Sequence, residues 1–294
     1  MSQHSGIDIM PHPVVELPVS VPDTIVVEAP SMLPDAAVAE LPNLSPFSGV
    51  ATLMMLSALL AVAVVVFYRF PLIDRTVAAW FFVENQCGPG KPARSVCGDF
   101  PLRHSPPFMA LRQFLQYLPI TLAAALAAAS ITRLRMGRLL GARRSVQAAA
   151  VFWTYVVSVG LLVNGVFKEF WGRPRPVQTD LFGGDFPFVP AGEISNYCAR
   201  NCSFISGEAA AAAWLVCLVA LLPRQYASLK PAAYGIAVAL ALGTSLLRMS
   251  FGAHYLSDVV IAGVVTMLTF SILATAAAWL HPQKRELPQT AAIC

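Results

Sequence analysis

Long apolar runs separated by short polar stretches dominate the chain from residue 48 onward. Six of these runs approach the roughly 20 residues that a helix needs to cross a bilayer. They cover 48–67, 114–132, 147–168, 206–222, 231–248 and 256–280. Each is predicted to be a transmembrane helix, so the fold class expected is an all-α polytopic membrane bundle of six helices.

The stretches outside these runs have a different composition. Residues 1–46 contain eight prolines and six acids but no lysine or arginine, which predicts a disordered cytoplasmic tail. The membrane domain is expected to cover 47–281, followed by a short cytoplasmic tail, 282–294. After the first run, 73–83 could form a short interfacial helix with an aromatic side.

Composition and charge support membrane insertion and indicate an orientation. The chain is 56% hydrophobic and only 12% charged, outside the range of soluble domains. Arginine-rich 133–145, the link 223–230 and the C-terminal tail all favour the cytoplasmic side. The connections 69–113, 169–205 and 249–255 are then outward. The basic residues lie at membrane boundaries, so nothing points to nucleic-acid binding, and a bacterial inner membrane is expected.

Four of the six cysteines fall in the predicted outward loops, which suits an oxidising compartment. Four cysteines allow three pairings, of which Cys87–Cys97 with Cys198–Cys202 is the locally simplest. A metal site at Cys198 and Cys202 is the rival interpretation, but no histidine or second close cysteine pair accompanies it.

Residues 245–260 place three chemically active side chains between two apolar runs. His254 follows Arg248 by six positions, and Asp258 follows His254 by four, which is one helical turn. A carboxylate beside an imidazole fixes its tautomer and leaves the other nitrogen free to attack or to carry a proton. The alternative is an ion cluster that anchors two helix ends at the membrane interface.

Two more outward segments carry candidate residues. Lys168 ends the third run, and Arg175 follows on a proline-stiffened segment, although both could belong to an ordinary basic and aromatic interfacial belt. Ser206 and Gly207 open the fourth run, where a helix N-terminus favours phosphate. Glu208 enters the apolar run directly afterwards, as a functional residue or as a simple complement to the helix dipole. Together with Arg248, His254 and Asp258, these side chains could bind a phosphate and transfer it.

These residues resemble the three motifs of the type 2 phosphatidic acid phosphatase (PAP2) superfamily of membrane lipid phosphatases. The first motif is complete from Lys168 to Arg175 and Pro176; the second corresponds to Ile205–Glu208 and the third to Leu247–Asp258. In two places the chain departs from the family pattern. Leu247 replaces a serine, and Glu208 replaces the histidine that in the family protonates the leaving group. His104 is the one other histidine predicted on the outer face besides His254.

The resemblance implies a six-helix lipid phosphatase with an outward site. His254 would attack phosphorus to form a phosphohistidine, and Asp258 would orient its ring. Lys168, Arg175, Arg248 and the Ser206–Gly207 amides would hold the phosphoryl oxygens, while Glu208 or His104 would supply the proton.

Several substrates and two other functions stay open. The expected substrate is a phospholipid, a polyprenyl diphosphate or lipid A, because the pattern around Arg173–Glu208 is most similar to the lipid A phosphatase branch. Lipid-to-lipid phosphotransfer and a catalytically silent lipid-binding or transport relative are the alternatives. No metal or other cofactor is expected, and the sequence leaves the oligomeric state undecided.

Overall fold

The computed structural model describes residues 47–89, 96–135 and 142–280. The predicted tails 1–46 and 282–294 lie outside the described residues, as does 136–141 of the arginine-rich connection. Within the described part, long helices predominate, and the few strands form one small antiparallel pair, β1 (Val83–Glu84) with β2 (Gly98–Asp99).

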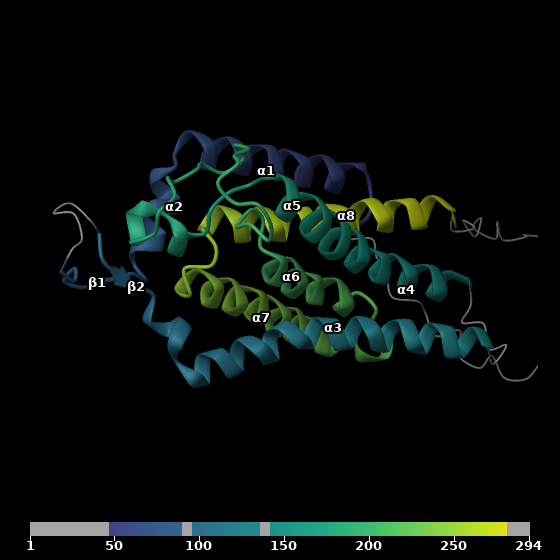
Figure 1. Cartoon of the computed structure of the whole chain (residues 1–294). Helices are drawn as coiled ribbons and strands as arrows, with labels where there is room; N and C mark the ends of the chain where they lie inside the picture. The colour runs from purple at the N-terminus through teal and green to yellow at the C-terminus, as the bar shows by residue number, and fades with distance from the viewer. Residues whose placement is uncertain (1–46, 90–95, 136–141, 281–294) are drawn as a thin grey trace, which may run out of the picture. The chain divides into compact units, whose positions relative to one another are not determined.

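The helices follow the predicted apolar runs in order (Figure 1). They are α1 (Val50–Arg69), α2 (Leu72–Ala79), α3 (Pro106–Arg135), α4 (Ala142–Thr154), α5 (Lys168–Phe170), α6 (Gly207–Val219), α7 (Lys230–Ser250) and α8 (Leu256–Leu280). A π-helical stretch, Tyr155–Phe167, joins α4 to α5, so that Ser145–Phe170 forms a single apolar span. Short 3₁₀ turns occupy Pro101–His104, Pro176–Gln178, Asp180–Phe182 and Arg224–Leu229.

Five helices of the described part are long and apolar enough to cross a membrane, which confirms five predicted spans. The sixth prediction, 206–222, corresponds to α6, which has only 13 residues. A helix of that length covers about 20 Å, less than the ~30 Å hydrocarbon core. Most α6 side chains are buried, and α3, α7 and α8 pack around it. Its alanine-rich sequence therefore makes a central helix rather than a full span.

Helix α3 begins eight residues before the predicted run. Pro106 opens it, as suits a residue without a backbone N–H in a first helical turn. The additional turns contain polar side chains, including Arg112, so a prediction based on apolar runs does not include them. This early start extends α3 towards the end of the bundle where α7 passes into α8, the end that also holds α2 and the β1–β2 pair (Figure 1).

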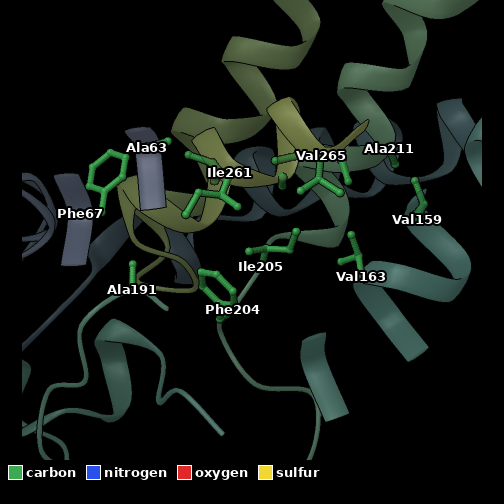
Figure 2. Packing of buried hydrophobic residues seen from close by; sticks show 14 of the residues in the cluster. Ala63, Phe67, Val159, Val163, Ala191, Phe204, Ile205, Ala211, Ile261 and Val265 are labelled. Atoms are coloured by element: carbon green, nitrogen blue, oxygen red, sulfur yellow. The ribbon is translucent and has the colours of Figure 1, made fainter. Parts of the chain in front are cut away.

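The principal core joins α1, the π-helical stretch, α6 and α8 around the segment that leads into α6 (Figure 2). Phe204 and Ile205 are buried there immediately before Ser206. The Phe204 ring stacks on Trp171 at a centroid distance of 5.1 Å and meets Phe167 edge-on at 5.7 Å. Packing therefore fixes the backbone at the start of α6.

The connections at the α7–α8 end are fastened covalently and by aromatic packing. Disulfides join Cys87 to Cys97 and Cys198 to Cys202, which confirms the locally simplest pairing. The predicted interfacial helix exists as α2 but stops at Ala79, so the aromatic side chains predicted for its apolar side follow it. Of these, Phe82 packs against Phe100 and Phe182.

Gly252 gives the turn between α7 and α8 its shape. Its φ of 60° lies in the left-handed region, where a side chain would be strained, and a Cβ atom would come within 2.5 Å of the buried Phe100 ring. The Gly252 carbonyl also accepts a hydrogen bond of 3.0 Å from the Val177 backbone N–H. Ring and backbone together hold the loop that contains His254.

We predict that Phe204→Ala destabilises the protein by about 3–5 kcal/mol, because it removes a buried ring from the core at the start of α6. Thermal unfolding in detergent measures the change. Phe170→Ala is the matched control, since the Phe170 side chain is 69% exposed and should contribute little. Equal shifts in the two variants would contradict the role of the Phe204 packing.

Candidate active site

The turn from α7 to α8 brings His254 against two oxygen atoms. Its Nδ1 lies 2.8 Å from the Ser203 carbonyl oxygen and 3.7 Å from Oδ2 of Asp258. A carbonyl can only accept a hydrogen bond, so Nδ1 carries the proton. Nε2 is then left with a free lone pair, which is the form of imidazole that can attack phosphorus.

Burial keeps this imidazole uncharged. The side chain of His254 is only 2% exposed. Desolvation lowers its pKa to about 4, although the hydrogen bond and charge of Asp258 act in the opposite direction. At neutral pH His254 is therefore unprotonated and available as a nucleophile.

Asp258 is held in place by donors from three other residues. Arg173 Nη1 donates to Oδ1 at 2.7 Å, while Ser203 Oγ and the Tyr255 backbone N–H donate to Oδ2 at 2.5 and 2.9 Å. Ser203 thus contacts both members of the predicted pair, with its carbonyl on His254 and its hydroxyl on Asp258. The predicted proximity of Asp258 to the imidazole is present, and most of the carboxylate's hydrogen bonds come from elsewhere.

Arg173 and Asp74 form a buried layer behind this pair that the sequence prediction missed. The Arg173 side chain is 0% exposed, and its Nη2 donates to Oδ2 of Asp74 at 2.8 Å. Asp74 also accepts from the N–H and hydroxyl of Ser257. Burial alone would lower the pKa of Arg173, but Asp258 and Asp74 raise it. The guanidinium therefore stays charged between two carboxylates.

The N-terminus of α6 lies beside Lys168. Ser206 caps the helix by accepting the Ala209 N–H on its hydroxyl at 3.3 Å. The Ser206 N–H itself donates to the Asp258 carbonyl oxygen at 3.1 Å. A Cβ atom on Gly207 would lie 3.2 Å from Lys168 Nζ, so glycine allows the ammonium group to approach the helix end closely.

A small cavity of 220 Å³ lies beside this turn and is strongly basic. Its lining contains four arginines and four uncharged residues: Arg103, Met109, Arg112, Arg175, Val177, Arg248, Phe251 and Ala253. Arg175 and Arg248 are there as the sequence predicts, whereas Arg103 and Arg112 are additional. Arg175 is steadied by Asn201, whose carbonyl and side-chain oxygens accept from its Nη2 at 2.9 and 3.1 Å.

Glu208 faces two of these arginines. Its Oε1 accepts from Arg112 Nη2 at 2.8 Å and from Nε at 3.2 Å, and its Oε2 lies 3.5 Å from Arg248 Nε. The role of proton donor for Glu208 stays a prediction, and this pairing gives it a second possible role.

His104 lies on the surface and is not among the residues that line the cavity. Its Nε2 is 2.5 Å from Oδ2 of Asp99, and its side chain is 63% exposed. His104, the alternative proton donor, is thus paired with the surface carboxylate of Asp99. Among the described residues, no group of three or more His, Cys, Asp or Glu side chains is placed to hold a metal ion.

Comparisons with known proteins agree with this architecture. The PAP2 superfamily model matches residues 147–282. A lipid A 4'-phosphatase of Rhizobium etli is 40% identical over 76% of this chain and 87% of its own length. A lipid A 4'-phosphatase of Rhizobium leguminosarum is 38% identical over 76% of this chain and 96% of its own length.

A solved structure also shares the fold. It is a transmembrane PAP2-type phosphatidylglycerolphosphate phosphatase from Bacillus subtilis, with a TM-score of 0.50 at 18% identity. The match covers 80% of this chain and all of the other. The chain belongs to the PAP2 superfamily. It is a multi-pass membrane lipid phosphatase, and its reaction class is phosphoric monoester hydrolysis.

We predict that Asp74→Asn destabilises the protein by about 1–3 kcal/mol, because the amide keeps only one acceptor oxygen for the buried donors of Arg173 and Ser257. The thermal midpoint in detergent reports the loss. Asp185→Asn, at an exposed position, is the control and should melt like the parent. If Asp74→Asn also melts like the parent, Arg173 does not depend on the second carboxylate.

Proposed function

We propose that this phosphatase removes a phosphate from lipid A through a phosphohistidine formed on His254, at the periplasmic face of a bacterial inner membrane. The two lipid A 4'-phosphatases that resemble most of the chain support this substrate. The disulfides of the loops around the site support an oxidising compartment. The alternatives from the sequence, a phospholipid or a polyprenyl diphosphate, are compared with lipid A in the test below.

One observation carries the mechanism. The Nδ1–H of His254 donates a hydrogen bond to the Ser203 carbonyl oxygen, which leaves the lone pair of Nε2 free. In the first step Nε2 forms a bond to phosphorus, and the bond from phosphorus to the lipid oxygen breaks. The imidazolium charge that develops is stabilised by Asp258, 3.7 Å from Nδ1. In the second step water attacks phosphorus, releasing inorganic phosphate and restoring the neutral ring.

The surrounding cations suit the charge that develops on the phosphoryl oxygens. We assign Lys168, Arg175 and Arg248 to these oxygens, together with the N-terminal end of α6 at Gly207. The Ser206 N–H is not part of this set, because it already donates to the Asp258 carbonyl oxygen. Lys168 interacts electrostatically with both arginines, which supports a shared site. No step needs a metal ion or other cofactor in this scheme.

The leaving lipid oxygen must gain a proton, and Glu208 has two possible roles in that step. It could donate the proton, as its place in the second motif suggests. It could also act as a carboxylate that holds Arg112 and Arg248, which its contacts support. Glu208→Gln on a lipid and on a nitrophenyl phosphate separates the roles, because the aryl leaving group needs no acid.

Incubating the purified protein with separate lipid phosphates tests the proposal. Lipid A, undecaprenyl diphosphate, phosphatidic acid and phosphatidylglycerophosphate are the substrates, and free phosphate and phosphorylated lipid are both measured. We expect fastest phosphate release from lipid A and none from a folded His254→Gln variant. Release from none of these lipids would contradict the proposal. Phosphate that appears on a second lipid instead would indicate phosphotransfer.

A further inference from the structure

Arg112 belongs to no motif of the chain, yet it enters the active site from α3. It lines the same 220 Å³ cavity as Arg175 and Arg248. Its side chain is 27% exposed, so it is partly shielded but still open to the cavity. A lone anchor at the membrane interface would not need to face two other arginines.

Glu208 holds Arg112 by one edge only. Nε and Nη2 of Arg112 both donate to Oε1 of Glu208, at 3.2 and 2.8 Å. Among the described residues, Nη1 has no hydrogen-bond partner. A guanidinium group offers five N–H donors in a fixed plane, so the edge that remains can bind another oxygen anion.

The same carboxylate forms an ion pair with Arg248 but no hydrogen bond to it. Oε2 of Glu208 lies 3.5 Å from Arg248 Nε, and the two terminal nitrogens of Arg248 have no partner in the described part of the chain. Glu208 thus stands between two guanidinium groups, hydrogen-bonded to Arg112 and paired by charge with Arg248. Without it, Arg112, Arg175 and Arg248 would repel one another across a small cavity with no carboxylate between them.

We propose that Arg112 binds a non-bridging oxygen of the substrate phosphate, and that Glu208 is the positioning residue that holds Arg112 and Arg248 for this contact. The inference rests on the proposed function and deepens it. The ligand class is a phosphate monoester carried by a lipid, whose dianion suits a cavity with several cations. Glu208 then acts as a carboxylate rather than as a proton donor, and the leaving lipid oxygen takes its proton from water.

Kinetics of Arg112→Gln and Glu208→Gln test the first half of this inference. Losing a charge-assisted hydrogen bond should reduce kcat/KM for the lipid phosphate by about 10- to 100-fold in each variant. Arg69→Gln is the matched control, because Arg69 is an exposed arginine at the end of α1, away from the cavity lining. Unchanged kcat/KM in a folded Arg112→Gln variant would overturn the proposal.

The double variant tests positioning. If Glu208 acts through the arginines, Arg112→Gln with Glu208→Gln should lose no more than the worse single variant. Glu208→Gln should also keep the parent's pH profile and lose equally on lipid and nitrophenyl phosphates. Losses that multiply, or a Glu208→Gln defect confined to the lipid substrate, would overturn the positioning role.

Two further measurements keep the outcome clear. If Arg112→Gln does not fold, Arg112→Lys keeps the charge but not the planar fork of donors, and it should still reduce kcat/KM.

Orthovanadate binding to the purified protein does not depend on turnover. If the parent hydrolyses no lipid, the proposed function fails, and weaker vanadate binding by the Arg112 variant still supports the contact. Equal vanadate binding would overturn it.

Discussion

The buried contact of Arg173 with two carboxylates is the interaction on which the proposed active site depends. It joins three parts of the chain, because Asp74 is 99 residues from Arg173 and Asp258 is 85 residues from it. All three side chains are 0% exposed. Leaving any of these charges unpaired in such a place costs several kcal/mol, so the three segments must assemble together. Asp258 is thereby fixed where it can support a charge on His254.

Hydropathy was enough to predict most of the fold, because a bilayer imposes a minimum length on each apolar run. The predictions failed where other forces set the length. Helix α6 is surrounded by other helices, and its small alanine side chains let them pack closely. The bilayer therefore sets no minimum length for it, and its 13 residues are fewer than a span requires. Helix α3 begins within polar sequence, and its Arg112 is paired inside the protein with Glu208 of α6. The number of apolar residues in a run indicates neither the burial of α6 nor the polar start of α3.

Candidate site residues that lie close together in the sequence could be predicted, whereas those that meet only in the folded protein could not. His254 and Asp258 lie one helical turn apart, and Lys168 and Arg175 share one exit segment, so spacing revealed them. Asp74, Arg173 and Arg112 meet their partners only through the tertiary fold. The available signals were weak: an acid within a short amphipathic helix, and an arginine shortly before an apolar run. Ser203 is harder still to find, because its carbonyl oxygen, a group that every residue has, contacts His254.

Trapping the covalent intermediate tests the central claim most directly. The protein is mixed with lipid A carrying radioactive phosphate, quenched in base during turnover and digested, and the labelled peptide is identified by mass spectrometry. The account predicts base-stable, acid-labile phosphate on His254, and no label in a folded His254→Ala variant that also fails to release phosphate. Continued phosphate release by that variant, or label on a different residue of the parent, would contradict the account.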